Sequence, residues 1–419
     1  GTVDWQTGSI KTATFTAASG EGYFCNTTGG AFTVNLPAGS AGAIVSVQDY
    51  NNTFDSNALT VEPNGSEKIN GGDGNIILNT EGEGLTLVYV DSTVGWRSIQ
   101  DNVFADVGNE FITATGGTIT TSGNCKIHTF TGPGTFAVSG LAACSAHNAL
   151  SYIVVAGGGG GGAEEGGGGG AGGFREVKTP VSPYTASPLD GYPSAPNRIT
   201  ATVASFPITV GGGGNGQTEP TVAASNGSNS IFSSITSAGG GRGGGQNSPT
   251  MDGGPGGSGG GGHGDGGGSP KAGGTGNTPP VSPAQGTNGG AGAGRTGTTN
   301  EGGGGGGGAT AAGTGGSTSP NPGGTGGPGG AGATTSISGS PVARAGGGGG
   351  AATTPAGVIG TGGTGGGGDG TKSQPSTAEA GTVNTGGGGG GGGGNGGAGP
   401  LSKGGAGGSG IVIIRYKFQ

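Results

Sequence analysis

The N-terminal quarter of the chain alternates between apolar and polar positions in short segments. These segments are rich in β-branched and aromatic residues and are separated by Gly, Asn and Asp, which is typical of strands that bury one face. Their regular spacing predicts an all-β sandwich or barrel. The predicted strands cover residues 10–16, 22–25, 31–36, 43–48, 58–62, 75–79, 84–90 and 95–99.

Two longer apolar segments, residues 151–156 and 410–418, flank the C-terminal part of the chain. Both are rich in β-branched and other apolar residues, with runs at 152–156 and 411–414, which indicates buried strands. A strand that followed a long disordered stretch would have no partner for its backbone groups. We therefore expect the two segments to pair and to close one domain.

Between these segments the apolar pattern disappears, because glycine dominates from Gly157 onward and forms uninterrupted runs at 302–308 and 386–394. Glycine has no side chain to bury and loses more backbone entropy on ordering than any other residue. Collagen is unlikely, since it requires glycine strictly at every third position. A flexible linker is an open alternative, but the flanking strands argue against it.

A bundle of glycine rods in the polyproline II conformation would order this region. Such a helix has three residues per turn and no internal hydrogen bonds, so its N–H and C=O groups point outward. Rods without Cβ atoms can approach closely enough to pair these groups with one another. We expect about ten rods joined by loops rich in Pro, Thr, Ser, Asn and Ala.

The purest glycine runs should occupy the innermost rods, because a rod with neighbours on every side tolerates no Cβ. Conversely, Ala171, Thr325 and Ala331 should point outward from peripheral rods. The predicted lattice-core positions are Gly302, Gly305, Gly308, Gly386, Gly390 and Gly394.

The expected fold class is therefore all-β N-terminal modules followed by a glycine-rich, polyproline II-type (polyglycine II) helix sandwich, with essentially no α-helix. Only 28% of the residues are hydrophobic and 9% are charged, so few conventional cores fit the chain. We expect a β-sandwich or barrel stem or anchor at 1–102, a short β connector at 103–150, and the glycine sandwich at 151–419.

Charge and motifs exclude several functions. The net charge of −8 provides no basic surface for nucleic acid, and no apolar stretch approaches the roughly 20 residues of a membrane-spanning helix. A nucleophile-elbow match at 256–260 lies in a glycine tract without the required strand and helix. Glu164 and Glu165 are expected in a solvated turn. We expect no enzyme activity, no cofactor and no membrane insertion.

Cysteine and histidine form the one repeated chemical motif. Cys125 and His128, and again Cys144 and His147, have the spacing Cys-x-x-His, which could contribute to a zinc site. Positions three apart in a strand point to opposite faces, so we expect no metal there. A Cys125–Cys144 disulfide is the stronger alternative for an extracellular protein, and Cys25 would then be a lone buried thiol.

The loops are where we expect binding. The longest, 174–207, places tyrosine and arginine, which are favoured binding anchors, among prolines that reduce the entropy lost on binding. The alternative is that Tyr184 and Tyr192 simply cap the rods. If consecutive rods are antiparallel, alternate loops, including 371–379, gather at one end. The candidate binding residues are Tyr184, Asp190, Tyr192, Asn197, Arg198, Asn247, Met251, His263 and Lys271.

Several of these segments resemble a known family. Residues 126–131, 134–138, 152–156 and 408–416 resemble the glycine-rich domain of bacteriophage tail-fibre and related virion proteins, while the region between them matches by composition. The predicted architecture is similar to that of the tip adhesins of T-even-like phages. Residues 15–96 look like a module of marine phage fibres. This resemblance implies a stem or anchor, which would be a trimer as fibre shafts often are.

The resemblance implies a tail-fibre or tip adhesin on an external appendage of the virion, hence an extracellular protein. Its partners would be a host-surface receptor, protein or glycan, and other tail or fibre proteins, with a homotrimer formed through the N-terminal modules. Two other classes stay open. One is a non-adhesive virion protein such as a head fibre, decoration or baseplate spacer, and the other is a bacterial extracellular glycine-rich filament protein.

Overall fold

The computed structural model describes residues 3–99, 111–142, 144–219, 221–246, 251–265, 268–294, 300–319, 323–354, 356–372, 375–394 and 402–419. Nearly all regular elements in these ranges are strands, accompanied by two short 3-10 helices, η2 (Ser145–Asn148) and η3 (Ala195–Asn197). The expectation of an all-β chain with essentially no α-helix is thus confirmed. Within the same ranges, no helix has the length and apolar character needed to cross a membrane.

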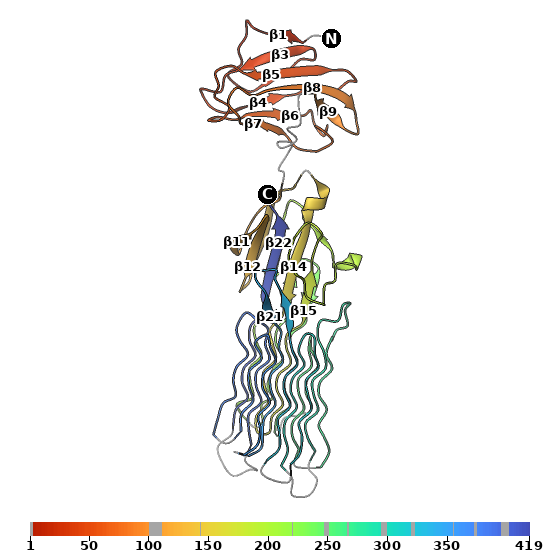
Figure 1. The fold of residues 1–419 in the computed structure, drawn as a ribbon, viewed down its shortest axis with the longest axis vertical. Coiled ribbons are helices and arrows are strands. Elements are labelled where there is room, and N and C mark those ends of the chain that lie inside the picture. The colour runs from red at the N-terminus through yellow and green to blue at the C-terminus, as the bar shows by residue number, and fades with distance from the viewer. Residues whose placement is uncertain are drawn as a thin grey trace. The chain divides into compact units, whose positions relative to one another are not determined.

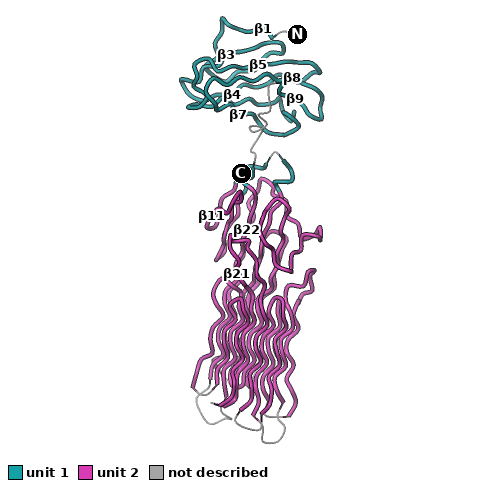
Figure 2. The backbone as a smooth tube through the Cα atoms, in the orientation of Figure 1, with its two compact units in different colours: residues 1–113, 138–148, 418–419 teal, residues 114–137, 149–417 magenta. Residues whose placement is uncertain are grey.

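Two compact units make up the chain (Figure 2). The first comprises residues 1–113, 138–148 and 418–419, and the second comprises 114–137 and 149–417. The strands of residues 103–150 do not form a separate sheet, because β11 (Thr118–Ser122) and β12 (Cys125–Phe130) pair within the sheet of the second unit.

The N-terminal part of the first unit consists of two sheets around one apolar core (Figure 1). Its first six strands alternate between the sheets, and those that become neighbours pair in parallel, as in a solenoid. The last three pair antiparallel. One sheet has the order β1 (Asp4–Trp5), β3 (Glu21–Cys25), β5 (Ile44–Asp49), β8 (Gly84–Asp91), β9 (Gly95–Ser98), and the other has β2 (Phe15–Thr16), β4 (Phe32–Asn35), β6 (Leu59–Glu62), β7 (Ile76–Leu78).

In the second unit, the two apolar flanking segments pair directly. They form β14 (Ala149–Val155) and β22 (Ile411–Lys417), antiparallel from Ser151 opposite Arg415 to Val155 opposite Ile411. The sheet order is β11-β12-β22-β14-β15, with β15 at Phe174–Val177 and β16 (Ile199–Thr200) also paired to β14. The other sheet strands are β10 (Thr113–Thr115), β13 (Gly134–Gly140), β17 (Ala204–Thr209), β18 (Ser230–Phe232) and β19 (Ile235–Ser237), and the hairpin is β20 (Ala333–Thr335) with β21 (Val342–Arg344).

The glycine segments form rods whose hydrogen bonds repeat every third residue. In the rod 157–162, residues three apart donate to the same neighbouring rod, so successive N–H groups point to three different rods at 2.9 to 3.0 Å. Its carbonyl groups accept from three further rods in the same rotation. Because the N–H groups of three successive residues point in three directions and the pattern then repeats, the rod is a helix with three residues per turn. With six hydrogen-bonded neighbours, it is part of a polyglycine II lattice.

The partners show the directions of these neighbours. The three rods whose carbonyl groups accept hydrogen bonds from 157–162 run antiparallel to this rod, and the three rods whose N–H groups donate to it run parallel. The acceptors are Ser228 and Ser225, Gly408 and Gly405, and Gly170 and Gly167; the donors are Gly240 and Gly243, Gly214 and Gln217, and Gly389 and Gly392.

The rod 166–172 occupies the centre of the lattice. Its six neighbours are glycine-rich rods that are buried at nearly every residue. The runs 302–308 and 386–394, for which the sequence predicts the innermost places, are two of these six. All the predicted core glycines in them are buried. The six surrounding rods include residues 159–162, 241–244, 258–261, 304–307, 348–351 and 386–392.

The prediction that Ala171 points outward is wrong. Its side chain is fully buried and belongs to an apolar cluster with Val155, Phe174 and Ile411. Ala171 lies where the central rod approaches β15, and there a methyl group packs against the strands instead of a neighbouring rod. Thr325 and Ala331 are half-buried.

Peripheral rods carry side chains, because one side of each faces solvent. The segments 225–228 and 311–314, whose Ser, Asn, Thr and Ala residues predict loops, are rods that accept hydrogen bonds from 157–162 and 302–308. At Gly168 in the centre, by contrast, a Cβ would lie 2.2 Å from the carbonyl oxygen of Gly348. The lattice therefore contains more rods than the glycine blocks alone predict.

Candidate functional sites at the two ends of the glycine lattice

Consecutive rods run in opposite directions, so the lattice has two different ends. The rod 157–162 continues from β14, and the rod 166–172 returns to β15 (Figure 1). We call the end next to these strands the sheet end, and the end at the turn 163–165 the turn end. The segment 174–207, which the sequence predicts as one long loop, contains β15, η3, β16 and the start of β17 and lies at the sheet end. Met251, His263, Lys271 and the described residues 371–372 and 375–377 lie at the turn end. Asn247 is outside the described residues.

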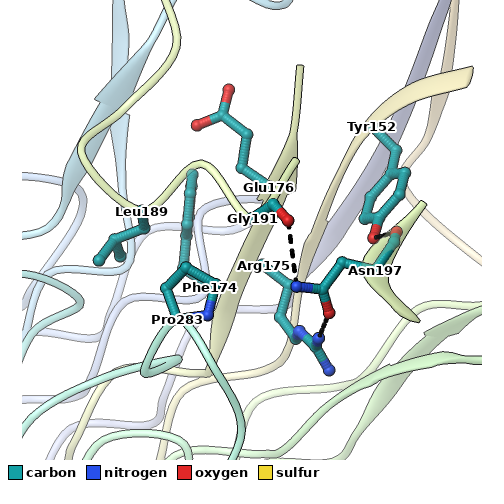
Figure 3. A pocket seen from close by; sticks show the side chains of 8 residues that line it. All are labelled: Tyr152, Phe174, Arg175, Glu176, Leu189, Gly191, Asn197 and Pro283. Carbon is teal, nitrogen blue, oxygen red and sulfur yellow. Dashed lines mark hydrogen bonds between the residues drawn. The ribbon is translucent and has the colours of Figure 1, made fainter. Parts of the chain in front are cut away.

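A small pocket opens within the loop at the sheet end (Figure 3). Its volume of about 10 Å³ is enough for about one water molecule. The lining residues are Tyr152, Phe174, Arg175, Glu176, Leu189, Gly191, Asn197 and Pro283.

Asn197 organises this pocket rather than facing solvent. Its side chain is 5% exposed and accepts a hydrogen bond from Arg175 Nη2 at 2.6 Å, as Figure 3 shows. Its Nδ2 donates to the carbonyl oxygens of Gly191 at 3.2 Å and Ser282 at 2.9 Å, and its own carbonyl oxygen accepts from the Tyr152 hydroxyl. Asn197 thus ties the loop to β14, β15 and the segment before Pro283.

Tyr184 caps the apolar layer at the sheet end. It packs against the cluster that contains Ala171, its hydroxyl donates to the Val177 carbonyl oxygen at 3.3 Å, and the Arg415 guanidinium lies 5.3 Å from its ring centre. Burial, the largest cause, raises the pKa of Tyr184 well above its usual value. This arrangement agrees with the alternative that the tyrosine covers the rods.

The other predicted residues of this loop hold its shape to different degrees. Asp190 Oδ1 accepts from the backbone N–H groups of Lys178 and Tyr192, each at 3.0 Å. Tyr192 is half-buried, and the guanidinium of the exposed Arg198 lies 4.4 Å from its ring centre. Tyr192 and Arg198 are therefore the accessible pair among the predicted residues at the sheet end.

A buried carboxylate that sequence reasoning missed connects this loop to the β20–β21 hairpin. Glu176 is 2% exposed, accepts from the Ser187 N–H at 2.9 Å and also accepts from the Thr335 hydroxyl. Burial raises its pKa, and these hydrogen bonds act in the opposite direction. Within the strand Phe-Arg-Glu-Val, no local signal indicates that this glutamate is buried.

The turn that closes the central rod is buried, which contradicts the expected solvated turn. Glu164 and Glu165 are 3% and 8% exposed and have left-handed φ values of 47° and 53°. Glu164 Oε1 accepts from the Ser402 N–H at 2.7 Å. The turn is covered because its two rods are surrounded by other rods, whose own turns enclose it.

His263 is packed beside this turn. It is 2% exposed, and its Nε2 lies 3.9 Å from Glu165 Oε2. Burial, the largest cause, lowers the pKa of His263 to about 4 despite the nearby acidic groups, so the ring is neutral at pH 7. A neutral buried histidine is a poor candidate for direct receptor contact.

The turn end also offers accessible side chains. Lys271 Nζ lies 3.0 Å from Asp265 Oδ2, and both are partly exposed. Met251 is half-buried. Val222 and Val358, which sequence reasoning did not select, are 59% and 62% exposed. Apolar, cationic and acidic groups are thus present on the turns at this end.

The structure does not join the cysteines of the Cys-x-x-His motif in a disulfide. All three cysteines are free, so the Cys125–Cys144 disulfide is absent. Cys125 is buried at the start of β12, whereas Cys144 is exposed. No group of three or more His, Cys, Asp or Glu residues in the described ranges is placed to hold a metal ion.

Both histidines of the motif have other partners. His128 Nδ1 lies 2.7 Å from the Gly116 carbonyl oxygen, and its Nε2 lies 3.0 Å from the Tyr416 hydroxyl. The His147 ring stacks on Phe111 with their centres 5.3 Å apart. His128 and Cys125 are three residues apart in one strand, so they point to opposite faces.

The fold is that of an all-β protein in which two paired strands, β14 and β22, close a domain of packed glycine rods. The chain belongs to the glycine-rich domain family, whose sequence profile matches residues 129–417. The match starts in β12 and ends with β22, so it includes both closing strands and every rod between them. No curated protein matches the chain.

Proposed function

We propose that this chain is a bacteriophage tail-fibre or tip adhesin that binds a host-surface receptor through the turn end of its glycine lattice. The observation that carries the proposal is the antiparallel order of the rods. It gathers several turns at one end of a single framework, and their described residues are 163–165, 217–219, 221–224, 263–265, 268–271, 352–354, 356–357, 371–372 and 375–377.

The lattice separates structural from binding residues. Most of its internal contacts are hydrogen bonds between backbone groups. Exposed turn residues such as Val222 and Val358 can therefore change without removing a contact between the rods, unlike the buried Glu164 and His263. Binding residues are commonly found on loops that a rigid scaffold positions. The exposed Val222 and Val358 and the partly exposed Lys271 are of the kinds that a receptor can contact.

In this proposal the protein is an external component of the virion and contacts other tail or fibre proteins through its N-terminal unit. The receptor is a surface protein or glycan. The loop 174–207 has a mainly structural role, because Asn197 and Tyr184 are engaged in holding β14, β15 and the apolar layer.

Binding of the fluorescently labelled full chain to a panel of bacterial strains tests this proposal. On a strain that binds, V358D and K271E should each weaken adsorption, whereas R198A at the sheet end should not. Adsorption lost only in R198A would refute the turn-end assignment. If the chain is found in virions but the labelled chain binds to none of the strains that the virus infects, the protein would be a structural virion protein instead. If the purified chain forms filaments in solution, an extracellular filament protein would be favoured.

A further inference from the structure

Three aromatic side chains lie on the outer face of one sheet in the N-terminal unit. Trp5 of β1 is opposite Gly22 of β3, and Phe24 of β3 is opposite Gln48 of β5. Residues opposite each other in neighbouring strands point to the same face, as do residues two apart in one strand. Trp5, Phe24 and Tyr50 therefore share the face that is directed away from the core.

The three rings form a continuous row. The ring centres of Trp5 and Phe24 are 5.0 Å apart, and those of Phe24 and Tyr50 are 6.4 Å apart. Trp5 is 38% exposed, Tyr50 is 53% exposed, and Phe24 is half-buried between them.

The missing side chain of Gly22 lets the Trp5 indole ring lie directly on the backbone of β3. A Cβ built on Gly22 would lie 2.8 Å from both Cδ2 and Cε3 of Trp5. The indole therefore lies against the backbone of β3, where any side chain would displace it. One face of the ring is held by the sheet, and part of the side chain stays accessible to solvent.

The surroundings of the row are polar but uncharged. On the same face, Ser46 and Thr86 share a hydrogen bond of 2.8 Å, and Gln48 lies beside Phe24. Next to Tyr50, Asn51 Nδ2 donates to Thr28 Oγ1 at 3.0 Å. The positions that the register places on this face in β3, β5 and β8 carry no Asp, Glu, Lys or Arg, and Arg97 of β9, opposite Val88, shares the face at the other edge of the sheet.

The size of the row indicates a small ligand. Aromatic side chains bury about 150–250 Å² each when fully covered. At the observed exposures the three rings offer roughly 200–300 Å², well below the about 800 Å² per partner of a stable protein interface. The row is therefore too small to hold a second copy of the chain by itself.

We propose that the aromatic row Trp5–Phe24–Tyr50 binds a neutral oligosaccharide. The C–H faces of sugar rings pack against aromatic rings, and sugar hydroxyl groups exchange hydrogen bonds with hydroxyl and amide side chains such as those of Thr28 and Asn51. The lack of charged residues on this face of β3, β5 and β8 matches a neutral glycan, and the net charge of −8 disfavours an acidic one. This site lies in a different unit from the turn end and does not depend on the adhesin proposal.

Calorimetric titration of the full chain with defined sugars tests the assignment. The probes are maltohexaose, cellohexaose, laminarihexaose and chitohexaose, with a hyaluronan hexasaccharide as the acidic comparison. For a neutral probe that binds, W5A and Y50A should each weaken binding at least about tenfold, and W5F should recover part of the loss. I77A is the matched control, since Ile77 is an exposed apolar residue, 45% accessible, in the other sheet.

Several results would overturn the proposal. They are no binding of any neutral probe, binding of the acidic probe alone, unchanged affinity in W5A and Y50A, or an equal loss in I77A. Light scattering provides an independent readout, because a dimer that Y50A dissociates would assign this face to contacts between copies. Cell adsorption is not measured here, so the result is independent of the turn-end variants.

Discussion

A single methyl group in the centre of the lattice should be strongly destabilising. Gly169 lies in the central rod, where its N–H donates to Gly389 at 2.8 Å and its carbonyl oxygen accepts from Gly348 at 2.9 Å. A Cβ at this position would lie 2.0 Å from the carbonyl oxygen and 2.6 Å from the carbonyl carbon of Gly159. Both clashing atoms are backbone, so no side-chain rotation relieves them.

The displacement needed gives the magnitude. A carbon and a carbonyl oxygen pack at about 3.3 Å at closest, so the rods 157–162 and 166–172 must separate locally by roughly 1.3 Å in G169A. Their hydrogen bonds, Gly159 to Gly170 and Gly162 to Gly167, are both 2.9 Å and would exceed hydrogen-bonding distance. Overpacking costs about 1–3 kcal/mol and each unsatisfied buried group about 1–3 kcal/mol. We expect the free energy of unfolding to fall by at least roughly 3 kcal/mol.

The matched control is G212A on a peripheral rod. Gly212 is exposed, and no heavy atom lies within 4 Å of a Cβ built there. Alanine reduces the entropy of the unfolded chain, so G212A should be neutral or more stable by about 0.4–1 kcal/mol. Urea unfolding followed by circular dichroism, with hydrogen exchange of the rod amides, measures both variants. Equal unfolding midpoints for G169A and G212A would refute the close-packed lattice and favour a flexible linker.

Three further predictions concern buried groups. H263Q should flatten the pH dependence of stability: the pKa of His263 falls from 6.5 to about 4 on folding, so wild-type stability declines as pH drops through that window, by up to roughly 3 kcal/mol. The prediction is contradicted if the free energy of unfolding, measured by urea titration, changes equally with pH in the wild type and in H263Q. Burial also lowers the pKa of His128, but this group contributes equally to both proteins. N197A should lower the free energy of unfolding by about 2–3 kcal/mol and speed proteolysis within 174–207, because it removes the hydrogen-bond partner of Arg175 and of the Gly191 carbonyl group. An unchanged cleavage rate would refute the bridging role of Asn197. A thiol reagent should label Cys144 alone in the native chain and all three cysteines after unfolding, whereas a single reactive thiol after unfolding would indicate a disulfide.

Much of the N-terminal unit is predictable from local pattern. The expected strands at 22–25, 31–36, 43–48 and 58–62 agree with β3, β4, β5 and β6 to within a residue or two at each end. Alternating side chains fix which face is buried, and this information is local. The two-residue strand β1 has too few positions for a pattern, and its pairing with β3 depends on the folded sheet.

The candidate sites are less predictable, because they depend on neighbours that are distant in sequence. Glu164 and Glu165 have the composition of an exposed turn, yet the turns of surrounding rods bury them. Tyr184 and Asn197 have the character of binding residues, yet their partners Arg415 and Ser282 come from remote segments. Polar residue type alone does not distinguish a solvated group from a buried and bonded one.

The sequence by itself determined that the glycine region is held by its backbone and closed by two strands, because residues without side chains have no other means of packing. Only the tertiary structure decided which rod is central, that 225–228 and 311–314 are rods, and which turns share an end. Whether a position tolerates a Cβ depends on how many rods surround it. That number is set by lattice packing across the whole domain, and no local pattern contains it.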